Sequence, residues 1–306
     1  MDKMSNGLIN VIVVTRKNGD YLASCLKSVS AQTYHTLEVS VIDNSQKNLF
    51  YCQALNQGIA KTSGEFVLCL NDDVILEPTF VEEALKGFAL NSDIGMVSGK
   101  ILRMDKQTLD STGLFLTCWR TAKERGYGKK DYGQFDKPGH IFGVNGAVAF
   151  YRRRMLDEIK INGEYFDQDF RIFYEDLDIA WRAQRFGWKG YYLPKAIACH
   201  VRGGTVRKEG GVNKKHARRY IADELYVDLT KNRYLTIIKN ETLLKFILFF
   251  PFIIAYDLLA WAHVLFFRPR LLKKLIFSII FLIPAFKKRL FHLEAKDNSN
   301  FCKLIC

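Results

Sequence analysis

The stretch "GEFVLCLNDDVILEP", Gly64 to Pro78, leads from a buried strand to a helix through a group of polar residues. The run from Glu65 to Leu70 is predicted as a strand, and Pro78 suits the first turn of a helix. Asn71, Asp72 and Asp73 lie directly after the strand. Because α/β sheets bind ligands at the carboxyl ends of their strands, these three residues mark a candidate site.

Strand and helix patterns alternate on both sides of this stretch. Further strands are predicted at Leu8–Val14, Leu37–Asp43 and Gly190–Val201. Helices are predicted at Phe50–Thr62, Pro78–Leu90 and Phe173–Trp188, and a strand followed by a helix at Gly143–Ile159. The segment from Lys100 to Gly143 is predicted to be irregular, with short strands. This order is typical of an α/β fold with a mixed, mostly parallel sheet flanked by helices.

The composition points to an anionic partner. The chain has 306 residues, 48% hydrophobic content and a formal net charge of +13, so nucleic acid, a phosphorylated small molecule and an acidic membrane surface all have to be weighed. No recognised nucleic-acid motif occurs, and the basic residues cluster beside apolar segments, so we expect no nucleic-acid partner. Seven cysteines without a repeating spacing favour a reducing cytosol over a disulfide framework.

The composition changes after Asn240. The segment Phe246–Phe267 has only Asp257 and His263 as ionisable residues and is long enough to cross a bilayer. Clusters of Lys and Arg bracket the apolar segment that follows, as suits an anionic cytoplasmic leaflet. We therefore expect a catalytic domain at 1–240, a membrane-associating helical region at 241–292 and a polar tail at 293–306. An in-plane or re-entrant helix at the cytoplasmic side of the cell membrane is favoured over a full span, and a buried helical hairpin is the alternative.

The acids after the predicted strands admit two interpretations each. Asp72 and Asp73 either help to bind a divalent cation whose shell is completed by substrate phosphates, or form a solvated turn. Asp43 either binds a nucleotide base or forms only an Asx turn. A P-loop is absent and no GxGxxG follows the first strand, which argues against nucleotide hydrolysis by that route and against dinucleotide binding.

The stretch "FYEDLDIAWR", Phe173 to Arg182, places three acids among large apolar residues. Carboxylates are costly to desolvate without a partner, so Glu175, Asp176 and Asp178 need an explanation. They either complement the dipole at the start of a helix or include a half-buried catalytic base. Asp178 and Arg182 are spaced as an i,i+4 ion pair, which favours a structural role for Asp178.

Taken together, these residues resemble the family 2 inverting glycosyltransferases with the GT-A fold. The matching pieces are "VIVVTRKNGDYLASCLKSVSAQTYHTLEVSVIDNS", "ALNQGIAKTSGEFVLCLNDDVILEP", "FGVNGAVAFYRR" and "FDQDFRIFYEDLDIAWRAQRFGWKGYYLPKAIACH". They occur in the family's order between Leu8 and Gly204. The stretch "FGVNGAVAFYRR", together with "KNRYLTIIKN", is most similar to the bacterial rhamnosyltransferases.

The resemblance implies a nucleotide-sugar site at the sheet edge. Asp43 would contact the uracil or thymine base, and Thr15 and Arg16 would flank the nucleotide. Asn71 and Asp72 would contact the nucleotide sugar, with Asp72 near the ribose or the sugar.

The resemblance also implies a cation and a base. Asp73, with His200 as a further ligand, would hold Mg²⁺ or Mn²⁺ against the diphosphate. Asp176 would be the catalytic base, and Glu175 its acceptor-orienting partner or the runner-up for the same role. Because a bound cation neutralises the leaving diphosphate, only the acceptor side needs a base.

The implied activity is transfer of a sugar with inversion from a nucleoside-diphosphate donor to a hydroxyl of a saccharide acceptor. dTDP-rhamnose is the expected donor, and a polyprenyl-diphosphate-linked saccharide is the expected acceptor, in cell-surface polysaccharide synthesis. Two alternatives are a UDP-hexose donor on the same fold and a non-catalytic, membrane-bound adaptor.

Overall fold

The computed structural model describes residues 7–16, 20–45, 50–202 and 222–290. Within them a nine-stranded sheet has the central order β2-β1-β3-β10-β5-β11-β4, with β6 on β5 and β9 on β11. The central strands are β1 (Ile9–Thr15), β2 (Leu37–Asp43), β3 (Phe66–Asn71), β4 (Val74–Leu76), β5 (Ile94–Arg103), β10 (Val148–Arg152) and β11 (Lys189–His200). The shorter strands are β6 (Leu109–Ser111), β7 (Leu114–Leu116), β8 (Ala122–Glu124) and β9 (Gly139–Ile141).

The sheet is mixed, as the sequence predicts. β1 runs parallel to β2 and β3, and β5 runs parallel to β11. The other pairings are antiparallel, including β10 with β3 and with β5. Because β10 enters the sheet in the opposite direction, its first residues lie beside the carboxyl end of β3, where the backbone N–H of Asn71 donates to the carbonyl of Ala147 at 3.0 Å.

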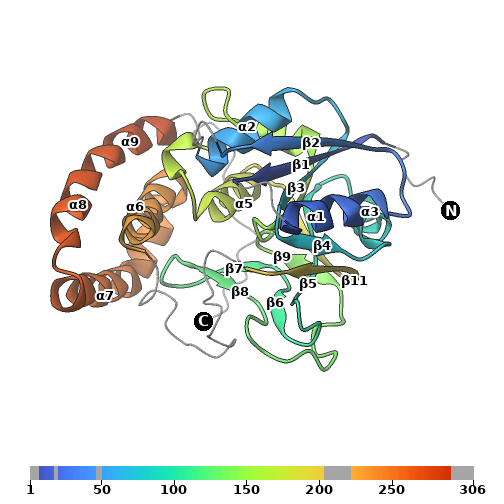
Figure 1. The fold of residues 1–306 in the computed structure, drawn as a ribbon. Coiled ribbons are helices and arrows are strands. Elements are labelled where there is room, and N and C mark those ends of the chain that lie inside the picture. Colours follow the sequence, from blue (N-terminus) through green and yellow to red (C-terminus); the bar gives the residue numbers. More distant parts are fainter. Residues whose placement is uncertain (1–6, 17–19, 46–49, 203–221, 291–306) are drawn as a thin grey trace.

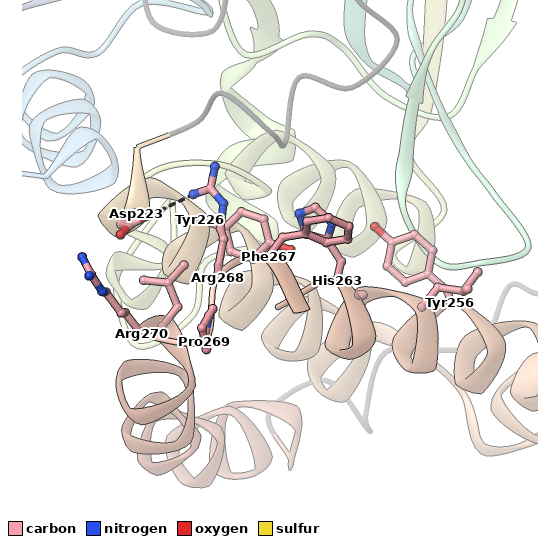
Figure 2. Close-up of a pocket in the computed structure, with 11 residues that line it drawn as sticks. Asp223, Tyr226, Tyr256, His263, Phe267, Arg268, Pro269 and Arg270 are labelled. Atoms are coloured by element: carbon pink, nitrogen blue, oxygen red, sulfur yellow. Dashed lines mark hydrogen bonds and ion pairs between the residues drawn. The ribbon is translucent and has the colours of Figure 1, made fainter. Parts of the chain in front are cut away.

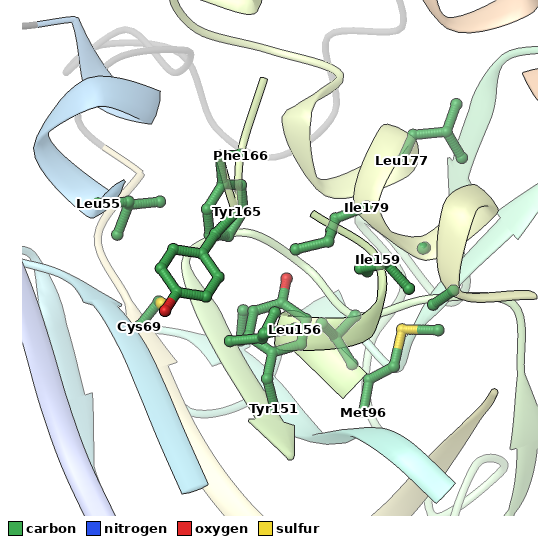
Figure 3. Packing of buried hydrophobic residues seen from close by; sticks show 14 of the residues in the cluster. Leu55, Cys69, Met96, Tyr151, Leu156, Ile159, Tyr165, Phe166, Leu177 and Ile179 are labelled. Carbon is green, nitrogen blue, oxygen red and sulfur yellow. The ribbon is translucent and has the colours of Figure 1, made fainter. Parts of the chain in front are cut away.

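Helices cover both faces of the sheet (Figure 1). α1 (Asp20–Ser30) and α3 (Phe80–Leu90) pack on one face through residues such as Cys25 and Phe80. α2 (Tyr51–Ala60), α4 (Arg153–Glu158) and α5 (Glu175–Arg185) pack on the other, where Leu55, Leu156 and Leu177 join one buried cluster (Figure 3). Packing on both faces of the sheet therefore holds its strands in place, and the candidate site lies at their carboxyl ends.

The helix expected at Phe173–Trp188 is shorter than predicted. α5 begins only at Glu175, because Phe173 and Tyr174 both have φ of 68°, in the left-handed region. A short 3₁₀ turn (Gln168–Phe170) precedes this bend. An apolar stripe predicts the body of a helix but not a left-handed bend at its start, since bulky side chains rarely adopt that conformation.

The C-terminal helices stand beside the sheet. α6 (Asp223–Asn240) lies inside an arc made by α7 (Leu243–Phe267), α8 (Leu271–Ser278) and α9 (Leu282–Leu290) (Figure 1). Among the described residues α7 is long and apolar enough to cross a membrane. The predicted polar tail at 293–306 and the basic, Gly-rich segment at 203–221 lie outside the described residues.

Candidate active site

The carboxyl ends of β1 and β3 bring together Thr15 and Asp72, two residues predicted to bind the nucleotide-sugar donor. The edge of the sheet at the carboxyl ends of β1, β2 and β3 is the donor edge. Thr15 Oγ1 donates to Asp72 Oδ2 at 2.6 Å, and the backbone N–H of Arg16 also hydrogen-bonds to Asp72. Burial raises the pKa of Asp72, the hydrogen bond from Thr15 opposes this rise, and the charge of Asp73 adds to it. Since β1 and β3 are neighbours in register, this pair follows from the parallel pairing itself.

Asp43 and Asn71 also lie at this edge. Asp43 is paired in register with Thr15, is exposed, and accepts the backbone N–H of Ser45 at 2.8 Å. Hydrogen bonds from the Ser45 side chain and then from this N–H lower the pKa of Asp43. The Asx turn is therefore present, and the exposed carboxylate remains accessible to a ligand. Asn71 Oδ1 accepts from the Tyr51 hydroxyl at 2.9 Å. Three adjacent strands thus end at these residues: Thr15, Asp43 and Asn71 are the last residues of β1, β2 and β3, and Arg16 and Asp72 come directly after β1 and β3.

Asp73 and His200, the two predicted metal ligands, are in contact. His200 Nε2 lies 3.2 Å from Asp73 Oδ1. The backbone places them so, because β11 pairs with β4 through His200 and Val74, and the N–H of Val201 donates to the carbonyl of Asp73 at 3.1 Å. The other ring nitrogen, His200 Nδ1, lies 2.9 Å from Asp110 Oδ2.

Asp110 is a residue that the sequence did not indicate. Its side chain is fully buried, and its Oδ1 lies 2.8 Å from Nε of both Arg103 and Arg202. Burial lowers the pKa of His200, but its hydrogen bonds to Asp110 and then Asp73 outweigh burial and raise the pKa overall. Asp110 fixes the orientation of the ring, as the outer partners of metal-binding histidines do.

Asp73 and His200 fit an open cation site. A carboxylate oxygen and an imidazole nitrogen converge, and Mg²⁺ in phosphate-binding sites uses one or two protein ligands while substrate phosphates supply others. In the described part of the chain, no group of three or more His, Cys, Asp or Glu side chains has a metal-binding arrangement. The cation would therefore depend on the diphosphate for the rest of its shell.

Glu175 and Asp176 lie at the start of α5 and face β10. The N–H of Gly146 donates to Asp176 Oδ2 at 3.2 Å, and the N–H of Leu177 donates to Oδ1 at 2.8 Å. A Cβ at Gly146 would lie 3.4 Å from Glu175 Oε1 and 3.5 Å from Asp176 Oδ2, so both carboxylates border the space beside this glycine. Burial raises the pKa of both acids, and that of Glu175 reaches about 8 because the charge of Asp176 adds to burial.

Gly146 links this carboxylate pair to the donor edge. The Tyr51 hydroxyl that contacts Asn71 lies 3.2 Å from the carbonyl oxygen of Gly146, whose N–H binds Asp176. Asp176 is thus connected to Asn71, at the end of β3, through Gly146 and Tyr51. The predicted base and the predicted donor residues therefore share one edge of the sheet.

Glu124 is a second residue that the sequence did not indicate. It is hydrogen-bonded to Ser111 and to Asn145 Nδ2, the residue before Gly146. Burial raises its pKa to about 7, although the charge of Arg202 opposes this rise. The charge of Arg202 also acts on Asp176. Arg202 therefore joins the electrostatic surroundings of the cation ligands to those of the base.

A buried asparagine of α6 holds the bend before Glu175 and Asp176, the predicted catalytic pair. Asn232 Nδ2 lies 2.8, 2.7 and 2.8 Å from the carbonyl oxygens of Phe170, Ile172 and Phe173. Asn232 is fully buried. Since left-handed backbone at bulky residues costs about 1–3 kcal/mol each, these bonds help to maintain the conformation from which Glu175 and Asp176 project.

Replacement of Asn232 by alanine is expected to lower kcat tenfold or more, because displacements of about 1 Å can reduce rates by about 100-fold. The dissociation constant for the nucleotide should stay nearly unchanged, since the donor residues lie on other elements. Steady-state kinetics and nucleotide titration measure both quantities. Asn56→Ala is the matched control, because Asn56 clamps the backbone of Phe166 with two hydrogen bonds, at 2.7 and 2.9 Å, outside the bend. Equal losses of kcat in the two variants would rule out a specific role for Asn232.

Comparisons with known proteins identify the family and the fold. Residues 51–222 match the family model described as glycosyltransferase like family 2. A poly-beta-1,6-N-acetyl-D-glucosamine synthase from Staphylococcus epidermidis is 24% identical over 172 residues, which are 54% of this chain and 36% of that protein. The chain thus matches only about a third of the length of its curated relatives.

Two solved structures share the fold. One is GalNAc-T7 with UDP, GalNAc and Mn²⁺, with a TM-score of 0.55 and 13% identity over 76% of this chain and 48% of that chain. The other is the mannosyltransferase PcManGT from Pyrobaculum calidifontis with GDP-Man and Mn²⁺, with a TM-score of 0.50 and 17% identity over 94% and 88%. Because the family model covers more than half of the chain and the fold is that of GT-A enzymes, the chain belongs to glycosyltransferase family 2.

Proposed function

We propose that this enzyme transfers a sugar with inversion from a nucleoside diphosphate, with dTDP-rhamnose as the leading donor, to a hydroxyl of a lipid-linked saccharide. The observation that carries the proposal is the contact of Gly146 with both Asp176 and Tyr51, the partner of Asn71. It puts a half-buried carboxylate of raised pKa beside the donor edge, which is the arrangement that one displacement step requires.

Asp176 is the proposed base. As the acceptor oxygen forms its bond to the anomeric carbon, its proton passes to the carboxylate of Asp176. The bond from that carbon to the leaving diphosphate breaks on the opposite side, so the configuration inverts. A cation held by Asp73 and His200, Mg²⁺ or Mn²⁺, would neutralise the charge of the diphosphate. Glu175 is placed to orient the acceptor, because its carboxyl borders the same space beside Gly146.

Transfer is expected to decline on acidification at a pH above the ordinary carboxyl range. Burial raises the pKa of Asp176 and of Glu175. A base accepts a proton only when it is ionised, so kcat should fall as the pH drops through the raised pKa and recover above it. Measurement of kcat between about pH 4 and about pH 9, at saturating donor, tests this. A rate that stays constant down to about pH 4, the ordinary pKa of an aspartate, would contradict a half-buried carboxylate of raised pKa as the base.

Exposed apolar side chains on α7, α8, α9 and the 3₁₀ turn Ile279–Phe281 support docking to a membrane. Six of them, each 61–78% exposed, are Leu244, Leu259, Phe266, Phe277, Ile280 and Ile283. Large contiguous apolar surfaces of this kind mark interaction sites with membranes or proteins. The flanking Lys273, Lys274 and Lys287 suit an anionic cytoplasmic leaflet, the proposed location of the enzyme.

The contacts of α7 with α6 favour a helix that lies in the membrane surface. Phe249 and Ile253 pack with Ile237, near the end of α6, whereas Val264 packs with Tyr226, near its start. Between them Asp257 is paired with Arg233. Since α7 follows α6 for about four turns, we infer that it lies along the bilayer rather than across it.

A panel of nucleotide sugars tests the proposed function. The full chain, with Mg²⁺ or Mn²⁺ and a polyprenyl-diphosphate-linked saccharide, is incubated with each donor, and products are measured by mass spectrometry. A rhamnosylated lipid product is expected. Transfer only from a UDP-hexose or GDP-hexose would replace the proposed donor, and no turnover with any donor would favour the non-catalytic adaptor.

A further inference from the structure

A pocket of about 890 Å³ lies among the C-terminal helices, apart from the carboxylates of the active site. It is formed by the start of α6, the second half of α7 and the corner that leads into α8. Figure 2 shows Tyr226, Tyr256, His263 and Phe267 along it, with Arg268 and Arg270 at one end. Its volume lies in the range of small-molecule sites, about 300–1,000 Å³.

The polar end of the pocket is cationic. Arg268 Nη1 lies 2.9 Å from Asp223 Oδ1, and its guanidinium lies over the ring of Tyr226, 4.9 Å from the centroid. With Arg270 also on the wall, the lining residues that the structure describes include two arginines and one carboxylate, a net charge of +1. A guanidinium that is already held in place loses little entropy on binding a phosphate, which its planar donors match.

The surroundings of the pocket are apolar. Leu259, on its wall, is 71% exposed, and Phe267, at the same corner, is 70% exposed. On α8, Ile276 and Phe277 are 59% and 67% exposed. A fully water-soluble phosphate compound would gain nothing from such a rim, whereas an amphiphile could place its headgroup on the arginines and its chains on the apolar surface.

We propose that this pocket binds the phosphate headgroup of a membrane lipid, with Arg268 and Arg270 as the phosphate ligands. The proposal rests on the membrane docking of the proposed function. The pocket is distinct from the active site, because Asp223 and Asn232 are nine residues apart on α6, or about 14 Å along the helix. A lipid bound there would orient the bend that Asn232 holds, and so the base, relative to the membrane.

Binding of a short-chain phosphatidic acid, kept monomeric in solution, tests the proposal. The full chain in an uncharged maltoside detergent should bind one molecule saturably, and Arg270→Gln should weaken this binding about tenfold or more, the usual effect of a lost bond to a charged group. Ala260→Trp should abolish it, because Ala260 lines the pocket and the indole would fill it without a change in charge. Circular dichroism checks that each variant is folded.

The matched control is the double variant Lys273→Gln and Lys274→Gln. Both lysines are exposed on α8 and neither lines the pocket, so the same face loses two charges. The control should bind the lipid within about twofold of the original chain, as surface substitutions usually have small effects. If the control loses as much lipid affinity as Arg270→Gln, binding reflects general charge attraction and the proposal is wrong. Unchanged lipid binding by Ala260→Trp would also contradict the proposal.

Two further experiments distinguish a lipid from soluble phosphate, and the lipid pocket from the proposed function. Inorganic phosphate should bind at least tenfold more weakly than the lipid, since it lacks chains for the apolar rim. Equal affinity would mean a site for soluble phosphate and overturn the lipid assignment. Release of nucleoside diphosphate with a water-soluble acceptor should be unchanged in all these variants. If the proposed function fails, that release is absent in the original chain, whereas lipid binding is unaffected.

Discussion

Replacement of Asp176 by asparagine is expected to lower kcat by about 10²–10⁴-fold, the usual contribution of a general base, with little change in nucleotide affinity. The amide can occupy the same place beside Gly146 but cannot accept the proton of the acceptor hydroxyl. Burial disfavours the ionised carboxylate of Asp176, but the amide can accept only one of the two backbone N–H bonds, from Gly146 and Leu177, so the variant should melt close to the temperature of the original chain. Turnover of a defined acceptor, nucleotide titration and a thermal melt measure the three quantities.

Glu175→Gln is the matched control for this variant. It removes an ionisable carboxyl from the adjacent residue, which also borders the space beside Gly146. We expect it to raise the KM for the acceptor and to retain much more of kcat than Asp176→Asn. If Glu175→Gln instead abolishes turnover and Asp176→Asn spares it, Glu175 is the base and the assignment is wrong.

Replacement of Lys239 by methionine is expected to cost about 3–5 kcal/mol of stability, as breaking a buried ion pair does. Lys239 Nζ lies 2.6 Å from Asp167 Oδ2 and 2.8 Å from Asp178 Oδ1. All three side chains are at most 1% exposed. Without Lys239, the buried carboxylates of Asp167 and Asp178 would lose the cation that they share. A fall of roughly 10 °C in the melting temperature of the full chain is expected.

Lys86→Met provides the control for Lys239→Met. Lys86 pairs with Glu83 at 2.6 Å, but its side chain is 46% exposed, so its loss should cost less than about 1 kcal/mol. Burial raises the pKa of Asp167, but Lys239 and Lys288 outweigh it and hold the pKa below its usual value. In Lys239→Met, Asp167 and Asp178 can take up protons instead. The loss of stability relative to the original chain should therefore shrink as the pH falls. A deficit that grows on acidification would contradict this role of Lys239.

The donor edge could be predicted because its information is local. The β-branched runs of β1, β2 and β3 indicate buried parallel strands, and parallel strands end at one edge. Thr15 and Asp72 are therefore neighbours, although 57 residues separate them. The contact of Asp73 with His200 was implied by the family resemblance, and the pairing of β11 with β4 accounts for it.

The supporting residues could not be predicted, because their partners are distant in the sequence. Asp110 and Glu124 lie in the irregular segment between Lys100 and Gly143, where no periodicity or motif distinguishes them. Asp110 becomes important only because it contacts His200, 90 residues away. The bend before Glu175 depends likewise on Asn232, about 60 residues further along. An apolar stripe carries no signal for such a contact.

The apolar C-terminal segment shows a related limit. Asp257 interrupts its hydrophobic run, which weakens the pattern of a spanning helix. In the structure the carboxylate is paired with Arg233 on α6. A hydropathy window records only the cost of the charge, because the partner lies 24 residues earlier.

The most direct test of the central claim is a crystal structure of the enzyme with Mn²⁺ and a non-hydrolysable analogue of its nucleotide-sugar donor. The claim is that Asp73 and Asp176 act on one substrate, from the two sides of its anomeric carbon. We predict anomalous density for Mn²⁺ in contact with Asp73 and the diphosphate, with the anomeric carbon facing Asp176 across an open acceptor position. Manganese bound away from Asp73, or a sugar turned away from Asp176, would contradict it.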